Sequence, residues 1–519
     1  MPGLPENQSR IGIGRSLVPG SAGNRRLRPI HSRREITMNF HTRSFLTGLS
    51  TLFLLTLSAR PAVSDDLSEI VAGPVEKVIG DCEFTEGPAW HPGGFLLFSD
   101  IPNNRILRVD VDGGVSEWLK PSLGANGLTC DAKGNVYVCQ GEGRRVVRLQ
   151  TGENGEPHPI GRVLAAEFED KPFNKPNDLA LDGAGGLYFT DPNYRQEDAV
   201  QPVEGVYYVS ADGDVTRVVD DLPRPNGVLV TQDGGALLVA NINEREIIRY
   251  PIEEPGKLGA GEVIFTGEEE ADGRGPDGMT LDAEGNIYAT YKSVVVLTPE
   301  GGLKGRIEVP EKPANCTFGG DDGRTLYITA RTSLYSAPMQ QSAADFRESG
   351  PKTGDLLVRA QALELVIPSA WQAEAPANRL RLAQFAVPGE EDDEETAGEF
   401  VVFPPFGGSA TDNIKRWIDQ FDPEDRKLAM YEGQAPQGDY ILVQLDGTYF
   451  KPVGPPIQRK TEPTEGMRML AVIFSAEAGG NFFLKLTGPE ATVDAAGEAF
   501  RKTFGGDSEG ETEYTLPEE

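Results

Sequence analysis

The chain has 519 residues, and its 80 Asp and Glu against 49 Lys and Arg give a formal net charge of −31. A surface this acidic repels nucleic acid and anionic lipid, so binding to either as a main function is excluded. The length exceeds that of one ordinary domain core, and 61 Gly with 39 Pro indicate many turns, an all-β bias and two or more domains.

Residues 1–64 form a basic leader. A charged stretch from residue 38 to 43 precedes an apolar run at 45–57, and Ala62-Val63-Ser64 follows with small residues at cleavage-site spacing. This pattern predicts a secretory signal peptide at about 38–64, and therefore a secreted or periplasmic protein. A membrane anchor is disfavoured because the apolar run is shorter than the roughly 20 residues that a span needs.

A short pattern recurs six times in the next 270 residues or so, at the spacing of about 40–50 residues typical of propeller blades. Each copy opens on a side-chain oxygen, continues into an apolar run, and is followed by a turn and a second apolar run. The openers are Glu86, Asn126, Asn177, Asn226, Asp277 and Asn315. Third and fourth strand-like runs follow in most copies. The sequence therefore predicts a six-bladed β-propeller over residues 70–340.

The openers occupy one place in every repeat, so in a propeller they form a ring around the central channel. Six carboxylate or carboxamide oxygens, with no His or Cys, are typical of a site for a hard cation. Ordinary turn chemistry explains any single Asn-Gly or Asp-Gly pair. It does not explain an oxygen at all six places, including Glu86-Gly87-Pro88, which cannot form the same turn. The ring interpretation is therefore favoured.

Cysteine and histidine offer little chemistry. The four cysteines are Cys82, Cys130, Cys139 and Cys316, and none are spaced as Cys-x-x-Cys. A disulfide between Cys130 and Cys139 is an alternative in an exported protein, although buried thiols are favoured. After the leader only His91 and His158 remain, and neither stands beside a nucleophile motif. Catalysis is therefore expected to depend on carboxylates and metal.

The repeat stops near residue 340. Residues 341–353 are interpreted as a polar linker that few contacts cross, so that the propeller folds alone. Residues 354–504 predict a smaller β-rich, β-sandwich-like domain of unknown function, with helices near 411–420 and 492–503. The acidic segment 505–519 is expected to be a disordered tail.

Several strings inside the repeats occur in a specific order. They are Phe84-Thr-Glu86-Gly-Pro, Ala125-Asn126-Gly-Leu-Thr, Lys175-Pro-Asn177-Asp178, Arg224-Pro-Asn226-Gly and Gly275-Pro-Asp277-Gly-Met. Together they resemble the gluconolactonase/regucalcin (senescence marker protein) family over residues 80–340. The resemblance implies a six-bladed propeller with one divalent cation in its channel. Ca²⁺ is the expected ion, with Zn²⁺, Mn²⁺ and Mg²⁺ as alternatives.

The same resemblance implies roles for individual residues. The implied metal ligands are Glu86, Asn177, Asn226 and Asp277. Asn126 is implied to face the substrate, and Lys175 stands where relatives often have an Arg or Ser that contacts it. The segment 140–145 lacks a histidine that many relatives carry, which leaves the identity of the sugar open.

These residues fit the hydrolysis of a sugar lactone. A cation held by two carboxylates and two carboxamides can polarise a lactone carbonyl and stabilise the oxyanion. Asp277 is the expected general base and Asp178 the second candidate. Lys175 and Tyr194 are candidates to bind sugar hydroxyls. The alternatives are a related propeller esterase or phosphotriesterase, and a non-catalytic propeller that binds a glycan or protein around a structural cation.

Overall fold

The computed structural model describes residues 67–517, apart from 153, 195–199, 268–274, 362, 390–395, 406, 454–459 and 477–479. The predicted signal peptide and the rest of the leader lie outside the described residues. The described part is almost entirely β-structure, with the helices α1 (Ala410–Ile418) and α2 (Glu490–Thr503) near its C-terminal end. In that part, no helix is both long enough and apolar enough to cross a membrane.

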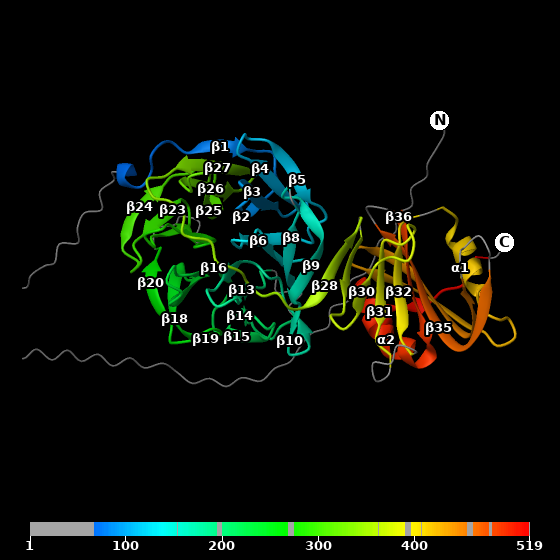
Figure 1. Cartoon of the computed structure of the whole chain (residues 1–519). Helices are drawn as coiled ribbons and strands as arrows, with labels where there is room; N and C mark the ends of the chain where they lie inside the picture. Colours follow the sequence, from blue (N-terminus) through cyan, green and yellow to red (C-terminus); the bar gives the residue numbers. More distant parts are fainter. Residues whose placement is uncertain are drawn as a thin grey trace, which may run out of the picture. The chain divides into compact units, whose positions relative to one another are not determined.

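Six antiparallel blades surround a central channel in the described residues, as predicted (Figure 1). The first blade consists of β2 (Thr85–His91), β3 (Phe95–Asp100), β4 (Arg105–Asp110) and β5 (Val115–Leu119). The second consists of β6 (Ala125–Cys130), β7 (Val136–Gln140), β8 (Arg145–Thr151) and β9 (Pro157–Ala165). The third consists of β12 (Leu179–Leu181), β13 (Leu187–Asp191), β14 (Gly205–Val209) and β15 (Val215–Val219). The small hairpin β10 (Glu167–Phe168) and β11 (Lys171–Pro172) lies between the second and third blades in sequence.

The other three blades complete the ring. The fourth blade consists of β16 (Pro225–Val230), β17 (Ala236–Asn241), β18 (Glu246–Glu254) and β20 (Glu262–Thr266), with the short β19 (Lys257–Leu258). The fifth consists of β21 (Met279–Leu281), β22 (Ile287–Thr290), β23 (Val294–Leu297) and β24 (Leu303–Ile307). The sixth consists of β25 (Pro313–Gly319), β26 (Thr325–Ala330), β27 (Ser333–Pro338) and β1 (Glu76–Ile79). The sixth blade thus takes its outer strand from the opposite end of the propeller, because β1 pairs with β27.

Aspartate side chains hold the hairpins between the inner strands. Asp131 Oδ1 accepts hydrogen bonds from the backbone N–H groups of Lys133 and Asn135, and Gly134 has a φ of 78°. Tyr137 donates from its hydroxyl to Asp131 Oδ2 at 3.1 Å. The Asp and Gly of this repeat therefore stabilise the turn between β6 and β7, as the sequence indicates.

The histidines and cysteines have structural surroundings. His91 is 5% exposed, its Nδ1 accepts from the Gly93 N–H at 2.9 Å, and its Nε2 lies 3.0 Å from the Gly134 carbonyl oxygen. All four cysteines are buried thiols without a disulfide. Burial raises the pKa of Cys82 to about 11, so this sulfur stays protonated at neutral pH.

The segment predicted as a loosely attached linker is packed against the propeller. Residues 340–354, here called the strap, follow β27 and cross the propeller toward β28 (Figure 1). Arg347 donates to the carbonyl oxygens of Val230 and Thr231, and the Gly350 N–H donates to the Tyr137 hydroxyl at 2.9 Å. The expectation of few contacts across 341–353 is wrong, because this segment makes hydrogen bonds to the second and fourth blades.

The chain then adds a hairpin to the second blade. Strand β28 (Asp355–Ala360) pairs with β9 on one side and with β29 (Leu363–Ile367) on the other, which gives a six-stranded sheet. Leu357 is buried in the core of this blade, whereas Leu363 and Leu365 belong to the core of the C-terminal sheet. The propeller sheet and the C-terminal region therefore share this hairpin.

The predicted β-rich C-terminal region is present as one eight-stranded antiparallel sheet. In spatial order its strands are β30 (Gln372–Glu374), β31 (Ala383–Val387), β32 (Gly398–Phe403), β36 (Gly480–Pro489), β35 (Thr461–Ala476), β34 (Gly438–Pro452), β33 (Lys427–Ala435) and β37 (Thr512–Glu513). Phe500 of α2 packs in one core of this sheet and Trp417 of α1 in the other. Helix α2 and the β28–β29 hairpin stand where a sandwich would have its second sheet.

The acidic tail is ordered up to the last described residue. Strand β37 pairs with β33, and the buried Glu511 carboxylate accepts two hydrogen bonds from Arg501. Tyr514 and Leu516 pack against the core that contains Trp417. The prediction of a disordered tail from 505 is wrong, because its composition is acidic but these few groups find buried partners.

A lysine in this sheet provides a pH-dependent prediction. Lys485 on β36 donates to Gln420 Oε1 at 2.9 Å and to the Tyr449 hydroxyl at 3.2 Å, and burial of its amino group lowers its pKa to about 8. Since the folded pKa lies below the ordinary value of 10.5, the charged amine destabilises the fold below pH 8, and this cost fades as the pH rises from 8 to 10.5.

We expect Lys485→Met to stabilise the protein at pH 7 by about 1–2 kcal/mol, after allowance for the lost hydrogen bonds. Calorimetric melting curves of both proteins measure the difference. The gain should shrink between pH 8 and 10. A gain that does not change with pH would show that packing, rather than titration of the amine, is responsible.

Candidate active site

The ring openers converge on one cavity in the propeller channel. This cavity measures ≈ 610 Å³, and its lining includes Glu86, Asn126, Asn177, Asn226, Asp277 and Tyr194. All four predicted metal ligands, the predicted substrate-facing Asn126 and the predicted sugar contact Tyr194 thus line the same space. Asn315, the sixth opener, is absent from this lining and belongs to a second cavity.

Backbone hydrogen bonds between neighbouring blades fix the ring. The Gly127 N–H donates to the Asn177 carbonyl oxygen at 2.8 Å, and the Gly227 N–H donates to the Asp277 carbonyl oxygen at 3.1 Å. Neither glycine has a positive φ, which a glycine-dependent turn would require. These Xaa-Gly pairs therefore bring two blades together at the channel, and the turn interpretation does not apply to them.

The close approach explains why glycine follows the opener. A Cβ at Gly227 would lie 2.3 Å from the Asp277 carbonyl oxygen, which is backbone and cannot move aside. We expect Gly227→Ala to separate the fourth and fifth blades and to cost about 1–3 kcal/mol of stability. Urea unfolding measures this cost. Gly510→Ala is the control, since nothing lies within 4 Å of its added methyl group and its φ is not positive.

Hydroxyl side chains form a second layer behind the ring. Ser99 donates from Oγ to the Asn126 carbonyl oxygen at 2.8 Å, and Thr190 donates from Oγ1 to that of Asn226 at 2.7 Å. Each hydroxyl belongs to the last-but-one residue of the second strand of the preceding blade. These contacts hold the backbone of the openers while leaving their side chains directed to other partners.

The side-chain oxygens of Asn177 and Asn226 accept no hydrogen bond from the described residues. Asn177 is 9% exposed, and its side chain makes no hydrogen bond to the described residues. Asn226 donates from Nδ2 to the Tyr194 hydroxyl at 2.5 Å. Since this contact occupies the amino group of Asn226, Oδ1 is the atom left to bind a ligand. Tyr194 therefore orients Asn226, in addition to any contact with substrate.

Glu86 is a buried carboxylate of the ring. Glu86 is 5% exposed, and its Oε2 accepts from the Gly87 N–H at 2.7 Å and from Asn315 Nδ2 at 3.2 Å. Burial, together with repulsion from Asp277, raises the pKa of Glu86 well above its usual value. A divalent cation would remove this unfavourable interaction. A buried and a half-buried acid beside carboxamide oxygens are a donor set that suits a hard cation.

No group of three His, Cys, Asp or Glu in the described residues is placed to hold a metal. This agrees with the composition of the ring, whose proposed ligands include only two carboxylates. The other two ligands, Asn177 and Asn226, supply carboxamide oxygens. Such a set favours calcium or another oxygen-seeking ion over a thiolate- or imidazole-bound one.

Comparison with known proteins agrees with this architecture. The family model for the SMP-30/Gluconolactonase/LRE-like region matches residues 84–332. The gluconolactonase of Zymomonas mobilis is 31% identical over 292 residues, which cover 50% of this chain and 80% of that protein. The chain belongs to the SMP-30/gluconolactonase family.

Two further family relatives cover the same region. The pentonolactonase XacC of Haloferax volcanii is 31% identical over 255 residues, covering 48% of this chain and 81% of that protein. A crystal structure of a protein named as a gluconolactonase superposes with a TM-score of 0.50 at 31% identity, covering 55% of this chain and 98% of its own. The β28–β29 hairpin and the C-terminal sheet lie beyond the residues that the family model matches.

Two of the predicted site residues do not line the first cavity. Asp178 lines the second cavity and not the first, and its Oδ1 accepts from the Leu179 N–H at 3.0 Å. Burial raises the pKa of Asp178 to about 7. Lys175 is likewise absent from the lining of the first cavity, and its Nζ forms an ion pair with Glu142 at 2.8 Å.

Sequence reasoning missed other parts of the cavity. Its lining also includes Phe84, Ile101, Ile242, Tyr291, Lys312 and Arg331. These residues belong to loops and strand ends that differ from blade to blade, so the repeat gives no signal for them. They add apolar and cationic surface to a site whose repeated residues are all oxygen donors.

Proposed function

We propose that this protein is a metal-dependent hydrolase of sugar lactones. The observation that carries the proposal is the convergence of the buried Glu86 carboxylate, the half-buried Asp277 carboxylate and the Asn177 and Asn226 carboxamides in one cavity of ≈ 610 Å³. Membership of the SMP-30/gluconolactonase family supports it, as do relatives named gluconolactonase and pentonolactonase. A cavity of this size is large enough for a monosaccharide lactone.

Each ring residue has a distinct part in the proposed reaction. Glu86, Asn177, Asn226 and Asp277 would hold the cation, and Ca²⁺ suits this set best. When bound, the cation polarises the lactone carbonyl and stabilises the developing oxyanion. Asp277 would accept the proton of the attacking water as general base. Asn126 binds a substrate hydroxyl, and Tyr194 keeps Asn226 in its orientation.

The basic leader supports export as part of the proposal. Cleavage after Ser64 would release a secreted or periplasmic enzyme with the whole propeller intact, since β1 begins at Glu76. A lactone in that compartment reaches the enzyme without crossing the inner membrane. Mass spectrometry of the mature N-terminus in the exported fraction tests this placement.

A substrate panel tests the reaction. The panel contains glucono-δ-lactone, a pentonolactone, an aryl ester and a phosphotriester, each assayed with and without chelator. We expect chelator-sensitive turnover of the sugar lactones, with kcat/KM at least tenfold above that of the ester. Preferential turnover of the ester or phosphotriester would favour the related propeller hydrolases. Metal binding without any turnover would favour a non-catalytic propeller.

A further inference from the structure

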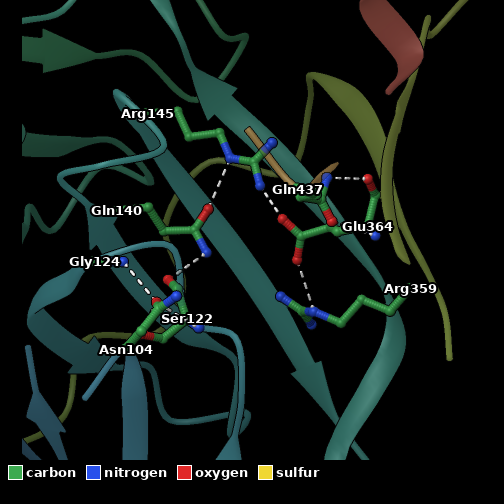
Figure 2. Close-up of polar contacts among 8 residues, drawn as sticks. All are labelled: Asn104, Ser122, Gly124, Gln140, Arg145, Arg359, Glu364 and Gln437. Atoms are coloured by element: carbon green, nitrogen blue, oxygen red, sulfur yellow. Dashed lines mark hydrogen bonds and ion pairs between the residues drawn. The ribbon is translucent and has the colours of Figure 1, made fainter. Parts of the chain in front are cut away.

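The C-terminal hairpin places one carboxylate inside the second blade. Glu364 on β29 has a side chain only 7% exposed, and its Oε1 and Oε2 accept hydrogen bonds from Arg145 of β8 and Arg359 of β28 respectively. Its backbone is also held, because the Glu364 N–H donates to Gln437 Oε1 and Gln437 Nε2 donates to the Glu364 carbonyl oxygen, both at 2.8 Å (Figure 2). The C-terminal sheet, through Gln437, thus fixes the position of this acid.

Two arginines depend on Glu364. Within the described residues, neither Arg145 nor Arg359 has another acidic partner, and Arg359 Nη1 and Nη2 have no hydrogen-bond partner at all. Burial and the nearby Arg145 guanidinium lower the pKa of Arg359, so the two cations destabilise one another. Loss of the shared carboxylate would leave two buried like charges, and Arg145 would turn away from its present place.

Arg145 also reaches toward the substrate cavity. Its Nε donates to Gln140 Oε1 at 2.7 Å, and Gln140, which is fully buried, donates from Nε2 to the Ser122 carbonyl oxygen at 3.1 Å (Figure 2). Ser122 begins the entry loop, defined here as residues 122–124. The loop leads directly into β6, whose second residue is Asn126.

The entry loop needs support of this kind. Leu123 has a φ of 54° and Gly124 a φ of 66°, so a non-glycine residue adopts the unfavourable left-handed conformation. Asn104 Oδ1 accepts from the N–H groups of Ser122 and Gly124, each at 3.1 Å (Figure 2). Gln140 supplies a further contact to the loop through the Ser122 carbonyl oxygen, and Gln140 is itself held by Arg145, the partner of Glu364.

The entry loop is also bonded to the adjacent loop at the channel. The Glu142 N–H donates to the Leu123 carbonyl oxygen at 3.1 Å, and the Gly141 N–H donates to that of Gly124 at 2.9 Å. Glu142 in turn holds Lys175. A displaced entry loop would therefore disturb both Asn126 and the segment that binds Lys175.

We propose that Glu364 is a positioning residue for the active site, which places Asn126 through Arg145, Gln140 and the entry loop. The inference rests on the proposed lactonase function, because Asn126 is its substrate-binding residue. The C-terminal region thereby forms part of the catalytic unit, although it lies outside the residues that the family model matches. Loss of the contacts that connect Glu364 with the entry loop should impair substrate binding and leave the metal ligands in place.

The test compares three variants of the full mature protein. Glu364→Gln removes the shared charge, Gln140→Met cuts the link to Ser122 while both arginines keep Glu364, and Asp446→Asn is the control. Asp446 forms a comparably buried ion pair with Arg468 in the C-terminal sheet, away from the substrate cavity (side chains 13% and 12% exposed). For glucono-δ-lactone, we expect KM to rise roughly tenfold in the first two variants, with kcat and the Kd for Ca²⁺ changed by less than about twofold.

Amide hydrogen exchange of residues 122–126 is the second readout. Exchange should accelerate in Glu364→Gln and Gln140→Met and not in Asp446→Asn. The proposal is overturned if Gln140→Met leaves both KM and exchange unchanged, a result that counts even if Glu364→Gln fails to fold. It is also overturned if Asp446→Asn shifts KM as much. If the unaltered protein hydrolyses no lactone, the proposed function fails, and the exchange data alone decide whether Glu364 positions the loop.

Discussion

Asp277→Asn should lower kcat for glucono-δ-lactone by about 10²- to 10⁴-fold, the usual contribution of a positioned general base. The substitution keeps an oxygen that can bind metal and keeps the shape of the side chain. The backbone of Asp277 is fixed independently of the side chain, since its N–H donates to the Thr290 carbonyl oxygen and its carbonyl oxygen accepts from the Gly227 N–H. Melting temperature and ring geometry should therefore change little. Steady-state kinetics with saturating metal measures the effect.

Asp178→Asn is the matched control for this prediction. Asp178 is an acid that directly follows another ring opener, but it is buried and lines the second cavity. We expect its kcat to stay within roughly tenfold of the unaltered protein. Near-normal turnover of Asp277→Asn together with a large loss in Asp178→Asn would transfer the role of base to Asp178. It would also mean that the substrate reaches deeper into the channel than the first cavity.

Removal of the metal should abolish turnover and also destabilise the fold. A ligand that binds only the native state at 100 to 1,000 times its Kd stabilises it by about 2.7–4.1 kcal/mol, and chelation removes this contribution. The physical source is the buried Glu86, whose pKa is raised by burial and by repulsion from Asp277. Calorimetry of chelated and recalcified protein measures the change in melting temperature.

Re-addition of single ions completes this experiment. Ca²⁺ should restore both activity and melting temperature. The recovery obtained with Mg²⁺, Mn²⁺ or Zn²⁺ then ranks these ions as alternatives. Glu86→Gln is the companion variant, because it keeps the acceptor oxygens and removes one negative charge. It should bind Ca²⁺ more weakly and lose less stability on chelation. Equal melting temperatures before and after chelation of the unaltered protein would show that no structural metal occupies the ring.

The sequence predicts the propeller and the ring because both are repeated. Six openers at one place in six copies carry more information than any one Asn-Gly pair, and blade geometry then brings them together. The same reasoning placed Asp178 near the metal, since it directly follows Asn177. Asp178 nevertheless lines the other cavity, just before β12 begins at Leu179.

Features that occur only once in the chain leave no repeated pattern in the sequence. The strap has a polar composition typical of a linker, and its packing depends on individual contacts such as those of Arg347 with the Val230 and Thr231 carbonyl oxygens. The pairing of β28 with β9 joins segments almost 200 residues apart, which hydrophobic periodicity cannot detect. Tyr194 was predicted to bind sugar, and its contact with Asn226 depends on a distance that only the folded structure provides.

The exchange of a strand between the two ends of the propeller has a consequence for its biosynthesis. Glu76 of β1 pairs with Ser336 of β27, so β1 is made first and has no partner in the sixth blade until synthesis has passed that point. The ring cannot close around its channel until β27 (Ser333–Pro338) has been made, and contacts this distant in sequence form slowly. An export route that carries unfolded chains would benefit from this delay, because the sixth blade stays open until β27 has emerged.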